Sequence, residues 1–302
     1  MSVDRRVAPP VRMVALDLDG TILESGTTID HQVLTTLETL QTKGVMCVTA
    51  TGRPLDFQVE LFERHNVGPT TGRFAALIAN EREIHLLDEH RQPAPAYHSY
   101  DEWNVVIRKR WDALLDEAMR WVDRVAAEAD RRGWTSRRFD RSEIARRGLA
   151  TIRLELSQHA AVLRDWLADR LLDAESELAC NRNTRLVQVV DRQAGKGNVL
   201  ATLADLCGVP ADQVLAIGDS SNDMSMLDGA FGFRAATPGN ADTEVKDAVR
   251  KCGGYVAQAR VGAGVIEALT AVTALVTPTA TTPPTPPTAA GQSPAQSHDT
   301  PV

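Results

Sequence analysis

Two pairs of aspartates follow short apolar runs near opposite ends of the sequence. Asp17 and Asp19 come directly after one such run, and Asp219 and Asp223 come after another at 214–217. Neighbouring carboxylates repel one another unless a proton or a metal ion neutralises one of them. A hard divalent cation such as Mg2+ prefers oxygen ligands and would meet this need. With the cation bound, Asp17 can stay ionised as a nucleophile towards phosphorus, while Asp19 acts as general acid and base.

A purely structural role is the alternative for each of these residues. An aspartate at the end of a strand often only caps a loop, and for a single Asp that is the better interpretation. The continuous segment Asp17-Leu18-Asp19-Gly20-Thr21 favours a site instead. Two acidic side chains two residues apart on an extended chain point the same way, and the glycine after them allows a sharp turn.

Three further places carry groups that suit phosphate. Thr51, Gly52 and Arg53 lie between an apolar run and a predicted helix, and a hydroxyl, a glycine amide and a helix N-terminus together suit an anion. Lys196 stands between two glycines at another helix start, and Asn222 can donate a hydrogen bond without adding negative charge. Taken singly each signal is weak, since such residues are also common as helix caps and in exposed turns. The lysine segment lacks the glycine spacing of a Walker A loop, which argues against a nucleoside triphosphatase of that kind.

The elements that must position these residues alternate between strands and helices. Apolar runs at 14–18, 45–49, 75–79 and 214–217 predict buried strands, with amphipathic helical patterns between them. This order is typical of an α/β protein with a Rossmann-like, parallel sheet. The candidate segments follow the ends of strands, and that edge of an open α/β sheet is where ligands bind.

A long segment interrupts the alternation and predicts an inserted domain. Residues 85–190 combine a long amphipathic helix, alternating apolar residues and further short strands, and we expect them to form an α+β cap domain. The predicted organisation is a flexible N-terminus at 1–11, a core in two parts at 12–84 and 191–276 around the cap, and a tail at 277–302. The tail is rich in Pro, Thr and Ala, a composition typical of disorder.

The overall charge and the cysteines narrow the class of protein. A formal net charge of -7 argues against nucleic acid or a membrane surface as the main partner, so a small molecule is expected. Four widely spaced cysteines without a CxxC pair predict neither a zinc site nor a disulfide framework. The N-terminus has no leader pattern and no apolar stretch reaches the length of a membrane span. We therefore expect a cytoplasmic protein that is a monomer or a homodimer.

The four candidate segments, in this order, resemble the motifs of the haloacid dehalogenase-like superfamily of phosphohydrolases. The large insertion resembles the cap of its Cof-type, subclass IIB members, and the segments Gly239-Asn240-Ala241 and Gly264-Val265-Ile266 are similar to that group's C-terminal signature. One departure is Asn80-Glu81, which stands where many relatives have Asn-Gly. That difference lies at the entry to the cap, and it bears on the choice of substrate.

The resemblance implies a role for each site residue. Asp17 would be the nucleophile and Asp19 the general acid and base. Mg2+ would be held by the Asp17 carboxylate, the Asp19 backbone carbonyl and Asp219, with Asp223 orienting the ligands. The residues implied to bind phosphate or substrate are Thr51, Gly52, Arg53, Lys196 and Asn222.

These roles predict a magnesium-dependent phosphatase that acts on a small phosphorylated metabolite, by analogy a sugar phosphate, through an aspartyl-phosphate. Specificity contacts are expected from the cap, with residues 181–185 as candidates. A phosphomutase of the same fold, similar to phosphomannomutases, would keep all the motifs but shield the aspartyl-phosphate from water. A binding module without catalysis is the third alternative, and the presence of both Asp17 and Asp19 disfavours it.

Overall fold

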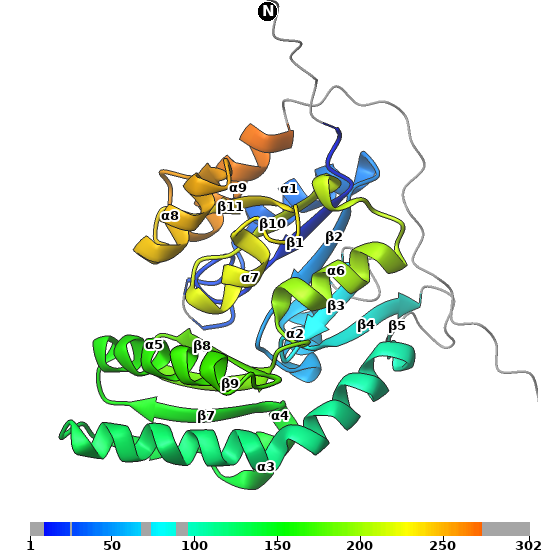
Figure 1. The fold of residues 1–302 in the computed structure, drawn as a ribbon. Coiled ribbons are helices and arrows are strands. Elements are labelled where there is room, and N and C mark those ends of the chain that lie inside the picture. Colours follow the sequence, from blue (N-terminus) through cyan, green and yellow to red (C-terminus); the bar gives the residue numbers. More distant parts are fainter. Residues whose placement is uncertain (1–8, 25, 68–73, 89–95, 274–302) are drawn as a thin grey trace, which may run out of the picture.

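A mainly parallel sheet of eight strands forms the core of the protein (Figure 1). The computed structural model describes residues 9–24, 26–67, 74–88 and 96–273. The strand order is β12-β11-β10-β1-β2-β3-β4-β5, and neighbours from β12 to β3 are parallel. The strands are β1 (Met13–Leu16), β2 (Met46–Ala50), β3 (Ala76–Ala79), β4 (Glu83–Asp88), β5 (Ala96–Ser99), β10 (Val214–Ile217), β11 (Arg234–Thr237) and β12 (Tyr255–Val256).

Helices cover both faces of this sheet, which makes it the buried centre of an α/β sandwich. Apolar side chains of α1 (His31–Thr42), α2 (Leu55–Arg64) and α9 (Val261–Thr273) pack on one face. Those of α6 (Lys196–Leu206), α7 (Met224–Leu227) and α8 (Thr243–Lys251) pack on the other, and the short 3-10 helices η1 (Ala211–Gln213) and η2 (Ser221–Asp223) flank β10. The predicted Rossmann-like core is thereby confirmed.

Strand register explains why segments far apart in sequence can share a site. Leu16, the last residue of β1, pairs with Ile217 at the end of β10 and with Thr49 near the end of β2. Three parallel strands therefore end at nearly the same level, and the polar residues after them emerge along one edge. Asp30 caps the start of α1, the helix after the β1 loop, because its side chain accepts a hydrogen bond from the Gln32 amide at 2.8 Å.

The inserted cap has its own antiparallel sheet of strand order β6-β7-β9-β8. It consists of α3 (Asp101–Arg131), β6 (Ser136–Arg138), α4 (Arg141–Arg147), β7 (Leu149–Leu154), α5 (Ser157–Asp173), β8 (Leu178–Asn183) and β9 (Leu186–Asp191). Apolar side chains from α3, α5 and the cap strands form a third hydrophobic cluster. In Figure 1 the cap lies below the core as a separate body. The predicted inserted α+β cap is present.

The expected start of the cap at residue 85 needs a correction, because it falls inside β4. This strand and β5 pair antiparallel with β3 and with each other, so hydrogen bonding assigns them to the core sheet. The long helix α3 then carries the chain from the core into the cap. Its first turn is fixed to the core, because Asn104 bonds both the amide and the carbonyl of Ile84 and Trp103 Nε1 donates to the Arg82 carbonyl at 2.7 Å.

The prediction of a disordered tail at 277–302 falls outside the described residues, and so does the prediction of a flexible N-terminus at 1–11 except for residues 9–11, of which Val11 is buried. Within the described ranges, no helix combines the length and the apolar character needed to cross a membrane.

Candidate active site

Carboxylates from both halves of the core meet at the edge where β1 and β10 end. Asp17 directly follows β1, and its amide donates to the Ile217 carbonyl at the end of β10. Among the described residues, one carboxylate oxygen from each of Asp17, Asp219 and Asp223 lies within 4.8 Å of the other two. Oxygens about 2.1 Å from a shared Mg2+ are separated by about 3–4 Å. The donor set is entirely oxygen and its spacing is close to this, so these residues fit a hard divalent cation.

Lys196 lies against this cluster with a fully buried side chain. Its ammonium is 2.6 Å from Asp17 Oδ1 and 2.5 Å from Asp223 Oδ1. The second oxygen of Asp223 accepts from the amides of Asp219 at 2.9 Å and Ser220 at 3.0 Å. The lysine at the start of α6 therefore links the nucleophile candidate to the loop after β10.

Burial and the excess of acidic groups set the electrostatics of the cluster. Burial raises the pKa of Asp17 well above its ordinary value; the Lys196 ammonium works against this rise, and Asp223 adds to it. Burial, together with the Asp223 charge, raises the pKa of Asp219 to about 7. Burial alone would lower the pKa of Lys196, but the carboxylates of Asp17, Asp223 and Glu81 raise it. A site with so much uncompensated acidity attracts a cation.

Two glycines leave room for carboxylates of the cluster, Gly20 for one from another loop and Gly218 for one from its own loop. Gly20 has a φ of 78°, and a Cβ at this position would lie 2.2 Å from Asp219 Oδ2. A Cβ on Gly218 would lie 2.4 Å from Asp223 Cγ. Thr21, for which no role was predicted from the sequence, donates from its buried hydroxyl to Asp219 Oδ1 at 3.4 Å. The turn after Asp19 is thus shaped to receive the Asp219 carboxylate.

Asp19 does not join the buried cluster. Arg53 Nε donates to its Oδ2 at 2.7 Å and Arg53 Nη2 to its Oδ1 at 2.6 Å, which makes a two-pronged ion pair. The Asp19 side chain is 50% exposed and the Arg53 side chain 43% exposed. The hydrogen bonds to Asp19 raise the pKa of the Arg53 guanidinium. Asp19 would have to exchange this partner for a leaving group to act as an acid or base.

Thr51 and Gly52 occupy the loop between β2 and α2, on the β2 side of the cluster. Thr51 is buried, and its hydroxyl oxygen accepts from the Arg53 amide at 3.2 Å. A Cβ added to Gly52 would lie 3.2 Å from Glu81 Oε1, so the backbone here is closely approached by that side chain. The predicted phosphate loop therefore borders both Asp19 and Glu81.

Glu81 is the site residue whose participation the motifs did not predict. Its carboxylate accepts from Asn222 Nδ2 of the core at 2.8 Å and from Asn181 Nδ2 of the cap at 3.2 Å. Burial raises the pKa of Glu81, although the Lys196 charge and the hydrogen bond from Asn222 oppose the rise. The only signal in the sequence was the departure from Asn-Gly at 80–81.

Ion pairs hold the cap strand β8 over the core. Arg182 Nη2 is 3.0 Å from Asp242 Oδ2 and 2.9 Å from Glu244 Oε1, and Arg164 Nη2 is 3.2 Å from Glu244 Oε2. The Ser221 hydroxyl also donates to the Arg182 carbonyl. The cap segment 181–185, expected to supply specificity contacts, therefore begins directly above the Asn222 loop.

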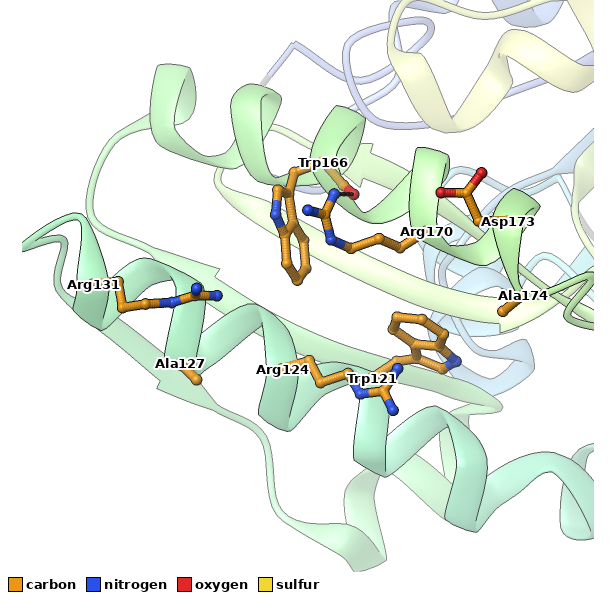
Figure 2. Close-up of a pocket in the computed structure, with 8 residues that line it drawn as sticks. All are labelled: Trp121, Arg124, Ala127, Arg131, Trp166, Arg170, Asp173 and Ala174. Carbon is orange, nitrogen blue, oxygen red and sulfur yellow. Dashed lines mark hydrogen bonds between the residues drawn. The ribbon is translucent and has the colours of Figure 1, made fainter.

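A cavity of about 510 Å³ lies elsewhere, between α3 and α5 of the cap (Figure 2). Trp121 and Trp166 face it from the two helices, and the guanidinium groups of Arg124 and Arg170 lie 4.4 and 4.1 Å from the centres of these two rings respectively. Its lining contains a single carboxylate, Asp173. It offers no set of metal ligands, so the chemistry belongs to the aspartate cluster.

Comparison with known proteins agrees with the motifs. Residues 14–84 and 157–269 match the haloacid dehalogenase-like hydrolase family, which is more than half of the chain. The unmatched segment between them contains all of α3, together with β6, α4 and β7 of the cap. The chain belongs to the haloacid dehalogenase-like hydrolase family.

Individual relatives match over different lengths. A phosphoglycolate phosphatase of Methanothermobacter thermautotrophicus is 34% identical over 111 residues, which cover 36% of this chain and 48% of the relative. The 5-amino-6-(5-phospho-D-ribitylamino)uracil phosphatase YitU of Bacillus subtilis is 23% identical over 252 residues, covering 78% of this chain and 88% of the relative. The chain thus spans about half the length of the first of these proteins.

Solved structures share the fold, including the type of cap. A sucrose-phosphatase of Synechocystis, solved with sucrose and phosphate, superimposes with a TM-score of 0.63 at 18% identity and covers 87% of this chain and 98% of its own. A subclass IIB sugar phosphatase superimposes with a TM-score of 0.56 at 15% identity and covers 88% of this chain and 100% of its own. The expected Cof-type, subclass IIB architecture is confirmed.

Proposed function

We propose that this chain is a magnesium-dependent phosphatase that hydrolyses a small phosphorylated metabolite of the sugar phosphate class. The observation that carries the proposal is the buried arrangement of Asp17 against Lys196 and Asp223, with Asp219 alongside. Membership of the hydrolase family and the phosphatase names of relatives that match most of the chain support it. The expected cytoplasmic location and the monomeric or dimeric state belong to the same proposal.

In the proposed mechanism the cluster prepares Asp17 for attack. Asp17, Asp219 and the Asp19 carbonyl would hold Mg2+ with the help of Asp223, and the bound ion would offset the negative charge of the phosphate oxygens. Lys196 fixes the Asp17 carboxylate through Oδ1 and brings a positive charge towards the phosphate. Thr51 and Asn222 supply donors from either side. Positioning and charge compensation of this kind carry most of the catalysis in phosphoryl transfer.

The chemistry then runs in two displacements. An Asp17 oxygen bonds to phosphorus as the ester P–O bond breaks, and the leaving oxygen takes a proton from Asp19. Water next loses a proton to Asp19 and bonds to the same phosphorus as the aspartyl P–O bond breaks. Inorganic phosphate leaves and both aspartates return to their first state. The cap keeps bulk water from the site between these steps.

The test is phosphate release from a panel of sugar phosphates, measured with Mg2+ and after its removal by EDTA. Asp17→Asn should lower kcat by at least about 1,000-fold, because removal of a nucleophile leaves only binding and orientation. Asp130→Asn, an exposed aspartate on α3, is the matched control and should be fully active. Near-normal turnover by Asp17→Asn would refute the proposal, and an isomerised sugar phosphate as product would identify a phosphomutase instead.

A further inference from the structure

Glu81 occupies a backbone position that disfavours glutamate. It lies in the turn between β3 and β4, where the Arg82 amide donates to the Ala79 carbonyl at 3.0 Å and both central residues are left-handed, with φ of 52° at Asn80 and 58° at Glu81. Turns with two left-handed central residues favour Asn followed by Gly. A strained residue beside a site points to a function for its side chain.

The Glu81 side chain is buried between the core and the cap, with 3% of the residue exposed. One oxygen binds the Asn222 amide of the core and the other binds the Asn181 amide of the cap. The Glu81 carbonyl accepts from Gly195, the residue before Lys196, at 3.0 Å. In an in-line attack by Asp17 the leaving group departs on the side of phosphorus opposite the attacking oxygen. We assign it to the space between core and cap, where the Glu81 carboxylate bonds Asn222 and Asn181.

Asn181 adds a second acceptor to this space. Because the Glu81 carboxylate only accepts, the amide group of Asn181 must turn its NH2 towards it, which leaves Asn181 Oδ1 on the other side. That oxygen is buried and accepts no hydrogen bond from any residue that the structure describes. Buried acceptors are normally satisfied, so a donor from a ligand is expected here.

The charge of the cluster points the same way. Asp17, Asp219, Asp223 and Glu81 bring four carboxylates together, and Lys196 brings one positive charge to them. One divalent cation still leaves an acidic site. A carboxylate or a second phosphate on the leaving group would add a like charge beside Glu81, whereas hydroxyl or amino groups would supply the missing donors.

We propose that Glu81 and Asn181 form a leaving-group subsite that selects phosphate esters of polyols or amino-substituted polyols and rejects esters with an anionic group close to the phosphate. This assignment rests on the proposed phosphatase function. Glu81 is then a specificity-determining residue, and the strained turn serves to place its carboxylate where the usual glycine has no side chain.

The experiment compares kcat/KM for three esters: ribitol 5-phosphate with several donors, phosphoglycolate with a carboxylate, and p-nitrophenyl phosphate with neither. Glu81→Gln should lower kcat/KM for ribitol 5-phosphate about tenfold and raise it for phosphoglycolate about tenfold, since the charge is lost at nearly constant shape. The p-nitrophenyl ester should change by less than about threefold. Glu81→Gly should shift the preference in the same direction.

Glu83→Gln is the matched control, because it removes a carboxylate two residues away that contacts Arg82, His85 and Arg108 rather than Asn181 or Asn222. Its preference among the three esters should equal that of the wild type. If Glu81→Gln changes all three esters equally, or changes none, Glu81 only supports the fold of the site and the assignment is overturned.

Calorimetric binding in the Asp17→Asn background separates this assignment from the proposed function. Ribitol 5-phosphate should bind about tenfold more tightly than phosphoglycolate, and addition of Glu81→Gln should abolish the difference. A wild-type protein that shows this binding preference but releases no phosphate would refute the phosphatase and leave the subsite standing. A phosphatase that binds both esters equally would overturn the subsite alone.

Discussion

Replacing Lys196 by methionine probes the buried charges on which the site depends. The lysine side chain has no exposed surface and makes ion pairs of 2.6 Å with Asp17 and 2.5 Å with Asp223. Methionine fills a similar volume but leaves two buried carboxylates without their ammonium. Removing one partner of a buried ion pair costs about 3–5 kcal/mol of unfolding free energy. For a protein of this size, about 2–4 °C per kcal/mol gives a midpoint lower by about 6–20 °C.

The loss should depend on pH in a defined direction. Lys196 lowers the pKa of Asp17, so its removal raises that pKa further above its ordinary value. A carboxyl whose pKa is higher in the folded than in the unfolded state binds more protons when folded, so the free energy of unfolding falls as pH rises between the two values. The defect of Lys196→Met should therefore be smaller at pH 5.5 than at pH 7.5.

The assay is thermal and urea unfolding in EDTA at both pH values, with Lys109→Met as the control. Lys109 is exposed on α3, and its replacement should change the free energy of unfolding by less than about 0.5 kcal/mol. Adding Asp17→Asn to Lys196→Met should restore part of the lost stability, since it removes one of the unpaired charges. A Lys196→Met protein as stable as the wild type, with the same midpoint at both pH values, would contradict the ion pairs described above.

Further predictions concern the acidic cluster and the cap. The pKa of Asp219 is raised to about 7, so its ionisation is unfavourable in the folded state. With EDTA present, the wild type should therefore lose stability relative to Asp219→Asn as pH rises from about 4 to about 7. The difference between the unfolding midpoints of the two proteins measures this loss of stability. Gly20→Ala should weaken Mg2+ binding in calorimetry and lower activity by at least about 100-fold, because its Cβ would overlap the Asp219 carboxylate. Arg182→Ala should speed hydrogen exchange in β8 and raise KM, because it breaks the ion pairs with which this side chain holds the cap over the core.

The changes at Gly20 and Arg182 each have a matched control. Gly26 has the same φ of 78° as Gly20 but no atom within 4 Å of an added Cβ, so Gly26→Ala bears the backbone cost without the overlap. Arg250 pairs with Asp247 on the exposed surface of α8, and Arg250→Ala should leave β8 exchange unchanged. If Gly20→Ala and Gly26→Ala behave alike, or Arg182→Ala leaves β8 protected, the geometry of the corresponding contact is wrong.

The sequence predicts the strands and loops that carry the aspartate cluster, because short apolar runs followed by polar residues determine these elements locally. The apolar run 214–217 is strand β10 at the predicted bounds, and parallel strands deliver the residues after them to one edge. The run at 14–18 is longer than β1, because the Leu18 carbonyl accepts from the amides of three turn residues and the chain has already left the sheet. The Leu18 side chain is buried in the core, although its backbone lies outside strand β1.

Other features depend on contacts that no local pattern contains. The run in β4 is consistent with either sheet, and only its pairing with β3 assigns it to the core. The ion pair between Asp19 and Arg53 joins residues 34 apart. Glu81 could be recognised as unusual from its neighbours in sequence, but its partners Asn181 and Asn222 are 100 and 141 residues away. Such residues enter a site only when the cap is placed over the core.

The continuity of α3 between the two bodies has a mechanical consequence. Its 31 residues, at 1.5 Å each, make a rod of about 46 Å whose first turn is fastened to β4 by Asn104. A rotation of about 5° at that end would displace the far end by about 4 Å, given a helix of this length. A small movement of the β3–β4 hairpin, which carries Glu81, would thus be amplified into a larger displacement at the far end of the cap. A ligand that contacts Glu81 would shift this hairpin and, through α3, the cap.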